Sequence, residues 1–265
     1  MAVGAAGRRF PQLGSAVSIR EEAARGFGQG ADAYERGRPS YPPEAVKWLG
    51  EELRLRPGRT VLDVAAGTGK LTRELVRSGA TVVAVEPLGA MRAVLERVVP
   101  GVRTLAGTAE TLPLGDQTVD AITAASAFHW FDGAAAAAEF HRVLRPNGRL
   151  ALLWNRRRLD QPIHRAVDEI IGRYRKRSPS HHRGEWRVPI ESSGLFVAAA
   201  EREIPLEQVL DRGRFVDRFS SISYVAALPE DQHQAVVERL SRLAADAGEP
   251  LRLGYTTELY VYARV

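Results

Sequence analysis

The sequence predicts an α/β fold with a doubly wound, mostly parallel sheet of seven strands. Three observations support this prediction. Short apolar runs alternate with helical stretches from residue 59 to residue 155, the connections between them are short, and a glycine-rich turn follows the first run. Strands that are apolar throughout and separated by helices belong to a parallel sheet covered on both faces. Short connections favour the doubly wound arrangement.

The predicted core consists of five strands with helices between them. The first strand is RTVLDVAA (59–66), and the helical stretch KLTRELVRSG follows it and is closed by Gly79. The remaining core strands are expected at 81–87, 102–107, 117–126 and 148–155. Helices are expected at 87–99 and at 131–146, the second one ended by Pro146.

Both ends of the chain add to this core. Residues 1–40 are rich in Gly and Arg and are interpreted as an N-terminal cap segment, and a helix with prolines in its first turn follows at 42–53. A partly helical, basic stretch of about 156–225 is interpreted as a C-terminal insertion. Strands at 195–206 and 256–265 complete the seven, with an amphipathic helix over 231–248 between them.

Composition excludes several classes of protein. The 265 residues are 45% apolar, which is enough for a full core, yet no apolar run approaches the roughly 18 residues of a membrane span. The N-terminus has no apolar segment of a secretory signal. The absence of cysteine excludes disulfides, thiolate metal sites, iron–sulfur clusters and cysteine nucleophiles. We therefore expect a cytoplasmic protein without a membrane partner.

Positive charge is concentrated in one segment, the basic strip 142–187. It holds thirteen Lys or Arg against four Asp or Glu, so its net charge is +9 while the rest of the chain carries −4. Such a strip can attract nucleic acid or an acidic small molecule. A solvated helix face is the alternative interpretation, and it leads us to expect no nucleic-acid partner.

The turn in VLDVAAGTGK (61–70) resembles three kinds of ligand-binding loop. A P-loop requires G-x-x-x-x-G-K-[ST], but Val64 and Leu71 occupy two of its fixed positions. A dinucleotide fingerprint requires G-x-G-x-x-G, and Thr72 occupies its third glycine position. The third kind places an acid, here Asp63, before the turn.

This third pattern resembles motif I of the class I S-adenosylmethionine (SAM)-dependent methyltransferases, usually D/E-x-G-x-G-x-G, with Ala65 at the first glycine. The resemblance continues in order through AVEP, GTAETLPL, SAFHWFD and HRVLRPNGRLALL, and covers about residues 33–154. It implies a Rossmann-like methyltransferase domain over 41–265. The SAM-binding core would span 59–154, and the insertion of about 156–225 would lie on the acceptor side.

The resemblance also implies SAM as cofactor and S-adenosylhomocysteine as product. Glu86 would accept hydrogen bonds from both ribose hydroxyls. Gly67 and Gly69 would admit the amino-acid tail, with Asp63 orienting the tail or the loop. Met91 is either an adenine contact or a core residue. The other cofactor-contacting positions implied by the family pattern are Ala65, Pro87, Thr108, Ala109, Glu110 and Ser126.

A second motif precedes the core. The stretch ADAYERGRPSYPPE (31–44) resembles the Y-x-x-x-R-P-x-Y-P segment of type 11 small-molecule methyltransferases, including trans-aconitate methyltransferase-like proteins. By this resemblance the segment would lie over the cofactor, and Tyr34 and Arg38 are cofactor-binding candidates: Tyr34 would face the sulfonium in a cation–π contact and Arg38 would meet a carboxylate. A rigid Pro-rich loop packed on the core is the alternative.

The stretch SAFHWFD ends the predicted fourth strand, where open α/β sheets bind ligands. His129 is a candidate general base there, or else a pocket residue. Tyr41, Trp130, Phe131 and Trp154 are expected to line the substrate pocket together with His129. Asp132 is predicted to cap the following helix.

Other methyltransferase signatures are missing. There is no [DNS]-P-P-[YFW] after the fourth strand, no cysteine for pyrimidine methylation, and no aspartate of the magnesium-dependent type, so we expect no metal and interpret His181 and His182 as a basic loop. The sequence thus predicts methyl transfer to oxygen or nitrogen of a small molecule, of the kind found among specialised metabolites. Carboxylate methylation of an acidic metabolite, RNA methylation using the basic strip, and SAM binding without catalysis stay open.

Overall fold

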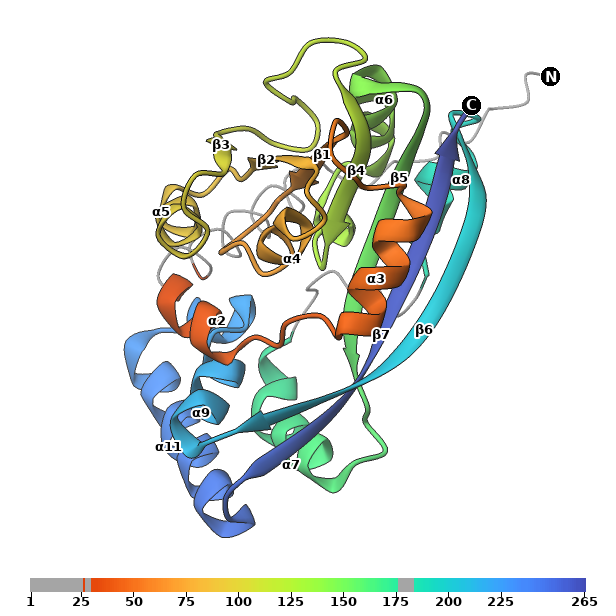
Figure 1. Cartoon of the computed structure of the whole chain (residues 1–265). Helices are drawn as coiled ribbons and strands as arrows, with labels where there is room; N and C mark the ends of the chain where they lie inside the picture. Colours follow the sequence, from red (N-terminus) through yellow and green to blue (C-terminus); the bar gives the residue numbers. More distant parts are fainter. Residues whose placement is uncertain (1–25, 27–29, 176–183) are drawn as a thin grey trace, which may run out of the picture.

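The computed structural model describes Gly26, residues 30–175 and residues 184–265. Within this part of the chain one sheet has seven strands in the order β3-β2-β1-β4-β5-β7-β6 (Figure 1). The strands are β1 (Thr60–Val64), β2 (Thr81–Val85), β3 (Arg103–Leu105), β4 (Val119–Ala125), β5 (Leu144–Arg157), β6 (Phe196–Leu210) and β7 (Leu251–Arg264). The first five are parallel, and β7 runs antiparallel to both of its neighbours. The predicted doubly wound, mostly parallel, seven-stranded sheet is confirmed.

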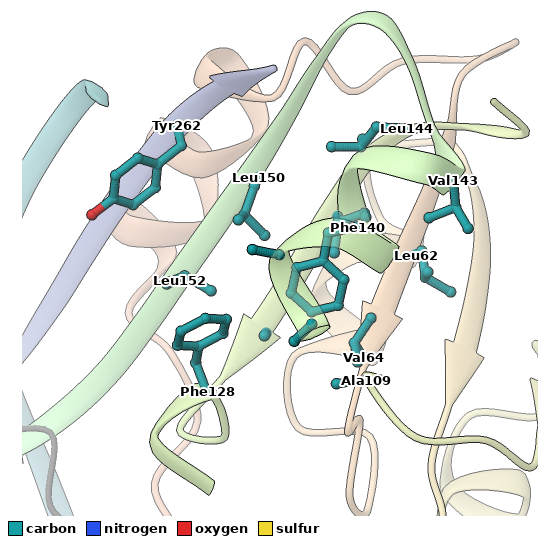
Figure 2. Packing of buried hydrophobic residues seen from close by; sticks show 14 of the residues in the cluster. Leu62, Val64, Ala109, Phe128, Phe140, Val143, Leu144, Leu150, Leu152 and Tyr262 are labelled. Carbon is teal, nitrogen blue, oxygen red and sulfur yellow. The ribbon is translucent and has the colours of Figure 1, made fainter. Parts of the chain in front are cut away.

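Helices cover both faces of this sheet because consecutive strand residues point to opposite faces. On one face Leu62 and Leu152 pack with Phe140 of α6 (Gly133–Val143), next to α8 (Arg187–Glu191) and the short η1 (Phe128–Trp130) (Figure 2). On the other face the neighbouring residues Val61 and Leu153 pack with α3 (Pro43–Glu52) and α4 (Thr72–Val76). The remaining core helix is α5 (Gly89–Val98).

Four helices, here called the helical cap, form a separate packed group below the sheet in Figure 1. They are α7 (Pro162–Ile171), α9 (Arg212–Ser220), α10 (Ser223–Ala226) and α11 (Glu230–Ala247), with η2 (Gly172–Tyr174) following α7. Their apolar side chains pack around Phe219 and Tyr255. The helix α2 (Ala31–Gly37) contacts both α9 and α5. The helix α7 follows β5, whereas α9, α10 and α11 follow β6, and the cap lies at the edge where the parallel strands end.

Several boundaries differ from the expected ones. The helix predicted over 131–146 ends at Val143, because a proline disfavours helical backbone in the residue before it and Pro146 already lies within the span of β5. The strand predicted over 256–265 starts five residues earlier, because its pairing with β6 continues into the cap as far as Leu210 and Leu251. Of the predicted segment 1–40, residues 1–25 and 27–29 lie outside the described residues. No helix in the described ranges is long and apolar enough to span a bilayer.

Candidate active site

The glycine-rich turn joins β1 to α4. Gly67 and Gly69 have φ angles of +59° and +84°, in the left-handed region that glycine adopts without strain. A Cβ on Gly69 would lie 3.1 Å from side-chain carbons of Leu95 and Val99, so the turn packs closely on α5. A Cβ on Gly67 would meet nothing within 4 Å. The turn is therefore closed toward α5 and open beside Gly67.

Ala65 also has a positive φ, +52°, although it carries a Cβ. A non-glycine residue in this region costs about 1–3 kcal/mol. The turn keeps this backbone conformation through the hydrogen bonds from the Ala66 amide to the Val85 carbonyl, 3.1 Å, and from the Gly69 amide to the Ala66 carbonyl, 2.9 Å. The replacement of the family's first glycine thus leaves the shape of the turn intact.

Asp63 lies under the turn and is 1% exposed. Its two carboxylate oxygens accept hydrogen bonds from the hydroxyls of Thr72, 2.7 Å, and Thr123, 2.8 Å. Burial raises the pKa of Asp63 to about 6, opposed by these two hydrogen bonds and reinforced by the charge of Glu86. Asp63 therefore holds β1, β4 and α4 together beneath the turn.

Glu86 directly follows β2 and lies beside the turn. Its Oε2 accepts from the Gly67 amide and its Oε1 from the Leu88 amide, both at 2.9 Å. Burial raises the pKa of Glu86, and the two amide hydrogen bonds oppose this rise. A carboxylate has about four acceptor positions, so about two remain for a ligand. Arg92 donates to the backbone carbonyls of Glu86 and Pro87, at 2.7 and 2.8 Å, and so fixes the loop before α5.

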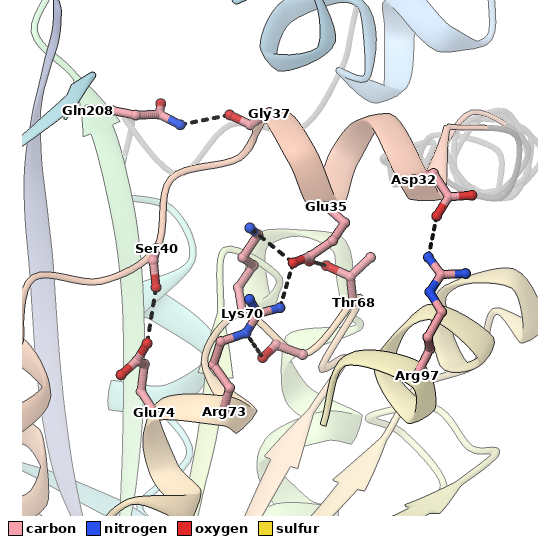
Figure 3. Close-up of polar contacts among 11 residues, drawn as sticks. Asp32, Glu35, Gly37, Ser40, Thr68, Lys70, Arg73, Glu74, Arg97 and Gln208 are labelled. Carbon is pink, nitrogen blue, oxygen red and sulfur yellow. Dashed lines mark hydrogen bonds and ion pairs between the residues drawn. The ribbon is translucent and has the colours of Figure 1, made fainter. Parts of the chain in front are cut away.

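The helix α2 is held against the turn by Glu35 (Figure 3). The Glu35 carboxylate accepts from the hydroxyl of Thr68 at 2.6 Å and pairs with Arg73 at 2.6 Å and with Lys70 at 3.3 Å. These contacts join α2 to the segment that carries both glycines of the turn.

On the neighbouring side of α2, Met91 is 3% exposed and packs with Ala31, Val94 and Tyr34. The guanidinium of Arg38 lies 4.7 Å from the centre of the Tyr34 ring. Tyr34 therefore contacts both the apolar cluster of Met91 and the guanidinium of Arg38.

The three residues after β3 that the family pattern assigns to the cofactor, residues 108–110, differ in exposure and in hydrogen bonding. Thr108 is exposed and its carbonyl accepts from the Thr111 amide at 3.3 Å, whereas Ala109 is buried in the core. Glu110 accepts from the backbone amide of Asp132 at 2.9 Å. Asp132 in turn accepts from the Ala135 amide at 3.2 Å, which confirms it as the N-cap of α6.

His129 lies at the carboxyl end of β4, in η1. The indole Nε1 of Trp154 donates a hydrogen bond of 3.1 Å to its Nδ1. Because an indole nitrogen only donates, Nδ1 of His129 is the acceptor, and a neutral ring then carries its proton on Nε2. In this arrangement Nδ1 of a neutral His129 accepts from Trp154 and is not available as a base.

Aromatic side chains surround this histidine. The Trp154 ring lies 4.5 Å from that of Trp186, which lies 4.9 Å from that of Tyr260. The Trp130 ring lies 5.3 Å from the His129 ring. Phe131, by contrast, packs edge-on against the core ring of Phe128 at 5.6 Å.

Tyr41 is 9% exposed and hydrogen-bonds to the side chain of Ser126, whose backbone at the end of β4 has a φ of +55°. Burial raises the pKa of Tyr41, so its hydroxyl stays protonated. Tyr41 and Ser126 thus meet after β4, and His129 meets Trp154 of β5, with Tyr41 and Trp154 in the apolar clusters on opposite faces of the sheet.

Several known proteins are similar to this chain in sequence and in fold. Residues 62–152 match the family model described as a methyltransferase domain. An uncharacterized methyltransferase of Mycobacterium tuberculosis is 40% identical over 226 residues, which cover 85% of this chain and 88% of that protein. The chain belongs to the methyltransferase family.

One further similar sequence and one similar solved structure support this family assignment. A methyltransferase-like protein of Schizosaccharomyces pombe is 34% identical over 212 residues, 80% of this chain and 82% of that protein. A solved structure from Anaeromyxobacter dehalogenans, named a type II methyltransferase, matches with a TM-score of 0.63 at 26% identity, over 84% of this chain and 97% of that one. The predicted class I, type 11 group is confirmed, and the chain is a SAM-dependent methyltransferase.

Three residues that shape the candidate active site of this methyltransferase were not identified from the sequence. Glu35 follows Tyr34 directly, and its basic partners Lys70 and Arg73 were visible beside the turn. Trp186 and Tyr260 reach Trp154 only through the fold, and no local pattern marked them. In the described ranges no group of His, Asp and Glu is arranged to hold a metal ion, and His181 and His182 lie outside them.

Proposed function

We propose that this methyltransferase transfers the methyl group of SAM to an oxygen or nitrogen atom of a small molecule. The observation that supports this best is the Glu86 carboxylate, held by two backbone amides beside the open side of Gly67. A ribose presents two neighbouring hydroxyl donors, which suit the acceptor capacity that Glu86 retains.

The residues around Glu86 also suit the rest of SAM. The open space beside Gly67 admits the amino-acid tail, with Ala65 and Gly69 shaping the turn. Met91, packed near Tyr34, offers an apolar contact for adenine. Pro87 and residues 108–110 would complete the adenosine side. When bound, SAM supplies an electrophilic methyl group on a sulfonium, and S-adenosylhomocysteine is the product.

The acceptor would be held by the residues at the ends of β4 and β5. With its ring fixed by the hydrogen bond from Trp154, His129 would contact the acceptor and orient its heteroatom toward the methyl donor. Trp130 and Trp154 would limit its position by contact with their rings. Holding two reactants in line contributes much of the rate when the leaving group is already good.

The first test is a calorimetric titration of the purified protein with SAM, S-adenosylhomocysteine and NADH. We expect the first two to bind and NADH not to bind. Replacing Glu86 by Gln should weaken SAM binding about 10- to 100-fold, the value of one or two charge-assisted hydrogen bonds. Glu96→Gln on the exposed face of α5 is the matched control and should leave the affinity unchanged. Binding of NADH alone would overturn the proposal.

The role of His129 is tested with an acceptor found by screening metabolite extracts for S-adenosylhomocysteine release. His129→Ala should lower kcat by more than it lowers SAM affinity, because its proposed contact is with the acceptor. An effect confined to SAM affinity would make His129 part of the cofactor site instead.

A further inference from the structure

Three arginines with buried, unused hydrogen-bond donors lie at the junction of α2, β5 and the helical cap. Arg218 of α9 is 4% exposed, and its Nε donates to the hydroxyl of Tyr255 at 3.0 Å. In the described part of the chain its Nη1 has no hydrogen-bond partner. The same holds for Nε of Arg38 and Nη1 of Arg157.

These arginines belong to one neighbourhood. A Cβ on Gly37 would lie 2.3 Å from the backbone nitrogen of Arg218, so the end of α2 touches α9 directly beside Arg38. Tyr255 is the register partner of Arg157 between β5 and β7. The guanidinium groups of Arg157 and Arg218 lie 5.9 and 5.1 Å from the centre of the Phe219 ring.

Negative charge is scarce in this neighbourhood. Burial, followed by the charge of Arg218, lowers the pKa of Arg38 to about 10, and the other titratable groups that act on it are Tyr34, Tyr224 and Tyr255. Among the described residues, neither Arg38 nor Arg218 forms an ion pair with a carboxylate, whereas Arg157 pairs with Asp168 at 2.9 Å. Arg218 is buried and Arg38 is half-buried with a buried Nε. A buried charge without a partner is costly, so this pair of cations indicates a ligand that supplies the missing charge.

Further unused polar atoms lie on elements of the same neighbourhood. They are Nδ1 of His164 on α7, Oε1 of Gln208 on β6 and Oγ of Ser221 after α9, none of which has a partner in the described ranges. The His164 ring lies 5.4 Å from that of Tyr255, and Gln208 donates to the Gly37 carbonyl at 2.8 Å. A polar ligand would find both donors and acceptors here.

We propose that Arg38 and Arg218 bind an anionic group, a carboxylate or phosphate, on the methyl acceptor. This inference rests on the proposed function and adds the chemical class of the acceptor, an anionic small molecule. A guanidinium donates charge-assisted hydrogen bonds to either group, and the unused Nε of Arg38 and Nη1 of Arg218 each supply one such donor.

The stability of the ligand-free protein gives a test that needs no knowledge of the acceptor. Replacing Arg218 by Met and Tyr255 by Phe together removes the uncompensated charge and both partners of its hydrogen bond. We expect Tm to rise by about 2–4 °C. The control Arg214→Met, on the exposed side of α9, should leave Tm unchanged. A lower Tm in the double variant would mean that Arg218 supports the fold and would overturn the proposal.

Ligand binding is tested on the full chain saturated with S-adenosylhomocysteine, with succinate and inorganic phosphate as probes and uncharged succinamide as the control ligand. Calorimetry should show binding of a charged probe but not of succinamide. Arg38→Met and Arg218→Met should each weaken it at least 10-fold, while Arg214→Met has no effect. Arg218→Met, which lies outside the proposed cofactor site, should change S-adenosylhomocysteine affinity less than twofold.

Three results would overturn the proposal. One is that no charged probe binds the wild-type protein, and another is that Arg214→Met weakens binding equally. The third is that Arg218→Met loses S-adenosylhomocysteine affinity, because Arg218 would then hold the cofactor tail. If the wild-type protein bound no S-adenosylhomocysteine at all, the proposed function itself would fail, and this outcome is distinct from the other three.

Discussion

Among single residues, Asp63 gives the protein a pH-dependent stability. Its pKa is about 6 in the folded protein against 3.8 for the free side chain, so the folded state binds more protons than the unfolded state between these values. The free energy of unfolding should therefore fall as the pH rises from about 4 to about 6, by roughly 2–3 kcal/mol from this residue.

The variant Asp63→Asn tests this slope, because an asparagine can still accept a threonine hydrogen bond but does not titrate. Urea unfolding at pH 4, 5, 6 and 7 should show a shallower decline for the variant than for the wild-type protein. Glu86 also has a raised pKa and is present in both, so the difference between the two curves reports Asp63. Equal slopes would contradict the assignment.

Individual letters of the sequence were informative where the backbone requires one residue type. Gly69 was recognisable because a left-handed turn packed on α5 leaves no room for a Cβ. In the sequence, Thr72 was informative only as the mismatch to a dinucleotide fingerprint. In the structure its hydroxyl donates a hydrogen bond to the Asp63 carboxylate. That role depends on the turn bringing two residues nine positions apart into contact, which residue type alone does not reveal.

At the scale of elements, α2 depends on Glu35 for its position. The helix has seven residues and is too short to be stable without tertiary contacts. Glu35→Gln removes the charge that pairs with Arg73 and Lys70, so we expect faster hydrogen exchange in α2 and about 10-fold weaker SAM binding.

The control for this prediction lies on the same helix. Asp32 forms an ion pair with Arg97 in which both side chains are more than half exposed, and such pairs contribute little. Asp32→Asn should therefore leave hydrogen exchange and SAM binding unchanged. If both variants behaved alike, Glu35 would have no special role in placing α2.

The strands were predictable as elements because a buried parallel strand is apolar along its whole length, whatever its neighbours. Their partners were not. The contacts of Trp154 with Tyr260 and of Arg218 with Tyr255 arise because β7, the last strand, inserts between β5 and β6. Pairing between segments about a hundred residues apart leaves no local pattern in the sequence, so the acceptor side was the least predictable part of the site.

For the whole molecule, the structure favours one interpretation of the basic strip 142–187. Eight of its ten described arginines form ion pairs, mostly with acids outside the strip. Arg149, for example, pairs with Glu52 of α3 at 2.8 Å, and Arg145 with Asp120 of β4 at 3.0 Å. The strip therefore joins elements of the fold instead of forming a continuous row of free cations.

This pairing predicts weak RNA binding. Each phosphate contact contributes about −0.7 to the log–log slope of affinity against salt for a single strand. We expect a slope shallower than about −2 for a labelled single-stranded RNA, measured by fluorescence anisotropy between 50 and 200 mM salt. A steeper slope would support the alternative of an RNA-directed enzyme.

The way the chain leaves and rejoins the sheet has a consequence for how such enzymes diversify. Leu210 at the end of β6 and Leu251 at the start of β7 are register partners, so residues 211–250, with α9, α10 and α11, depart and return at adjacent points. A segment bounded in this way can be replaced by recombination as one cassette without altering the strand order. The segment that carries Arg218, and with it the proposed acceptor contact, can then diverge among relatives while the turn around Gly67 and Gly69 is inherited unchanged.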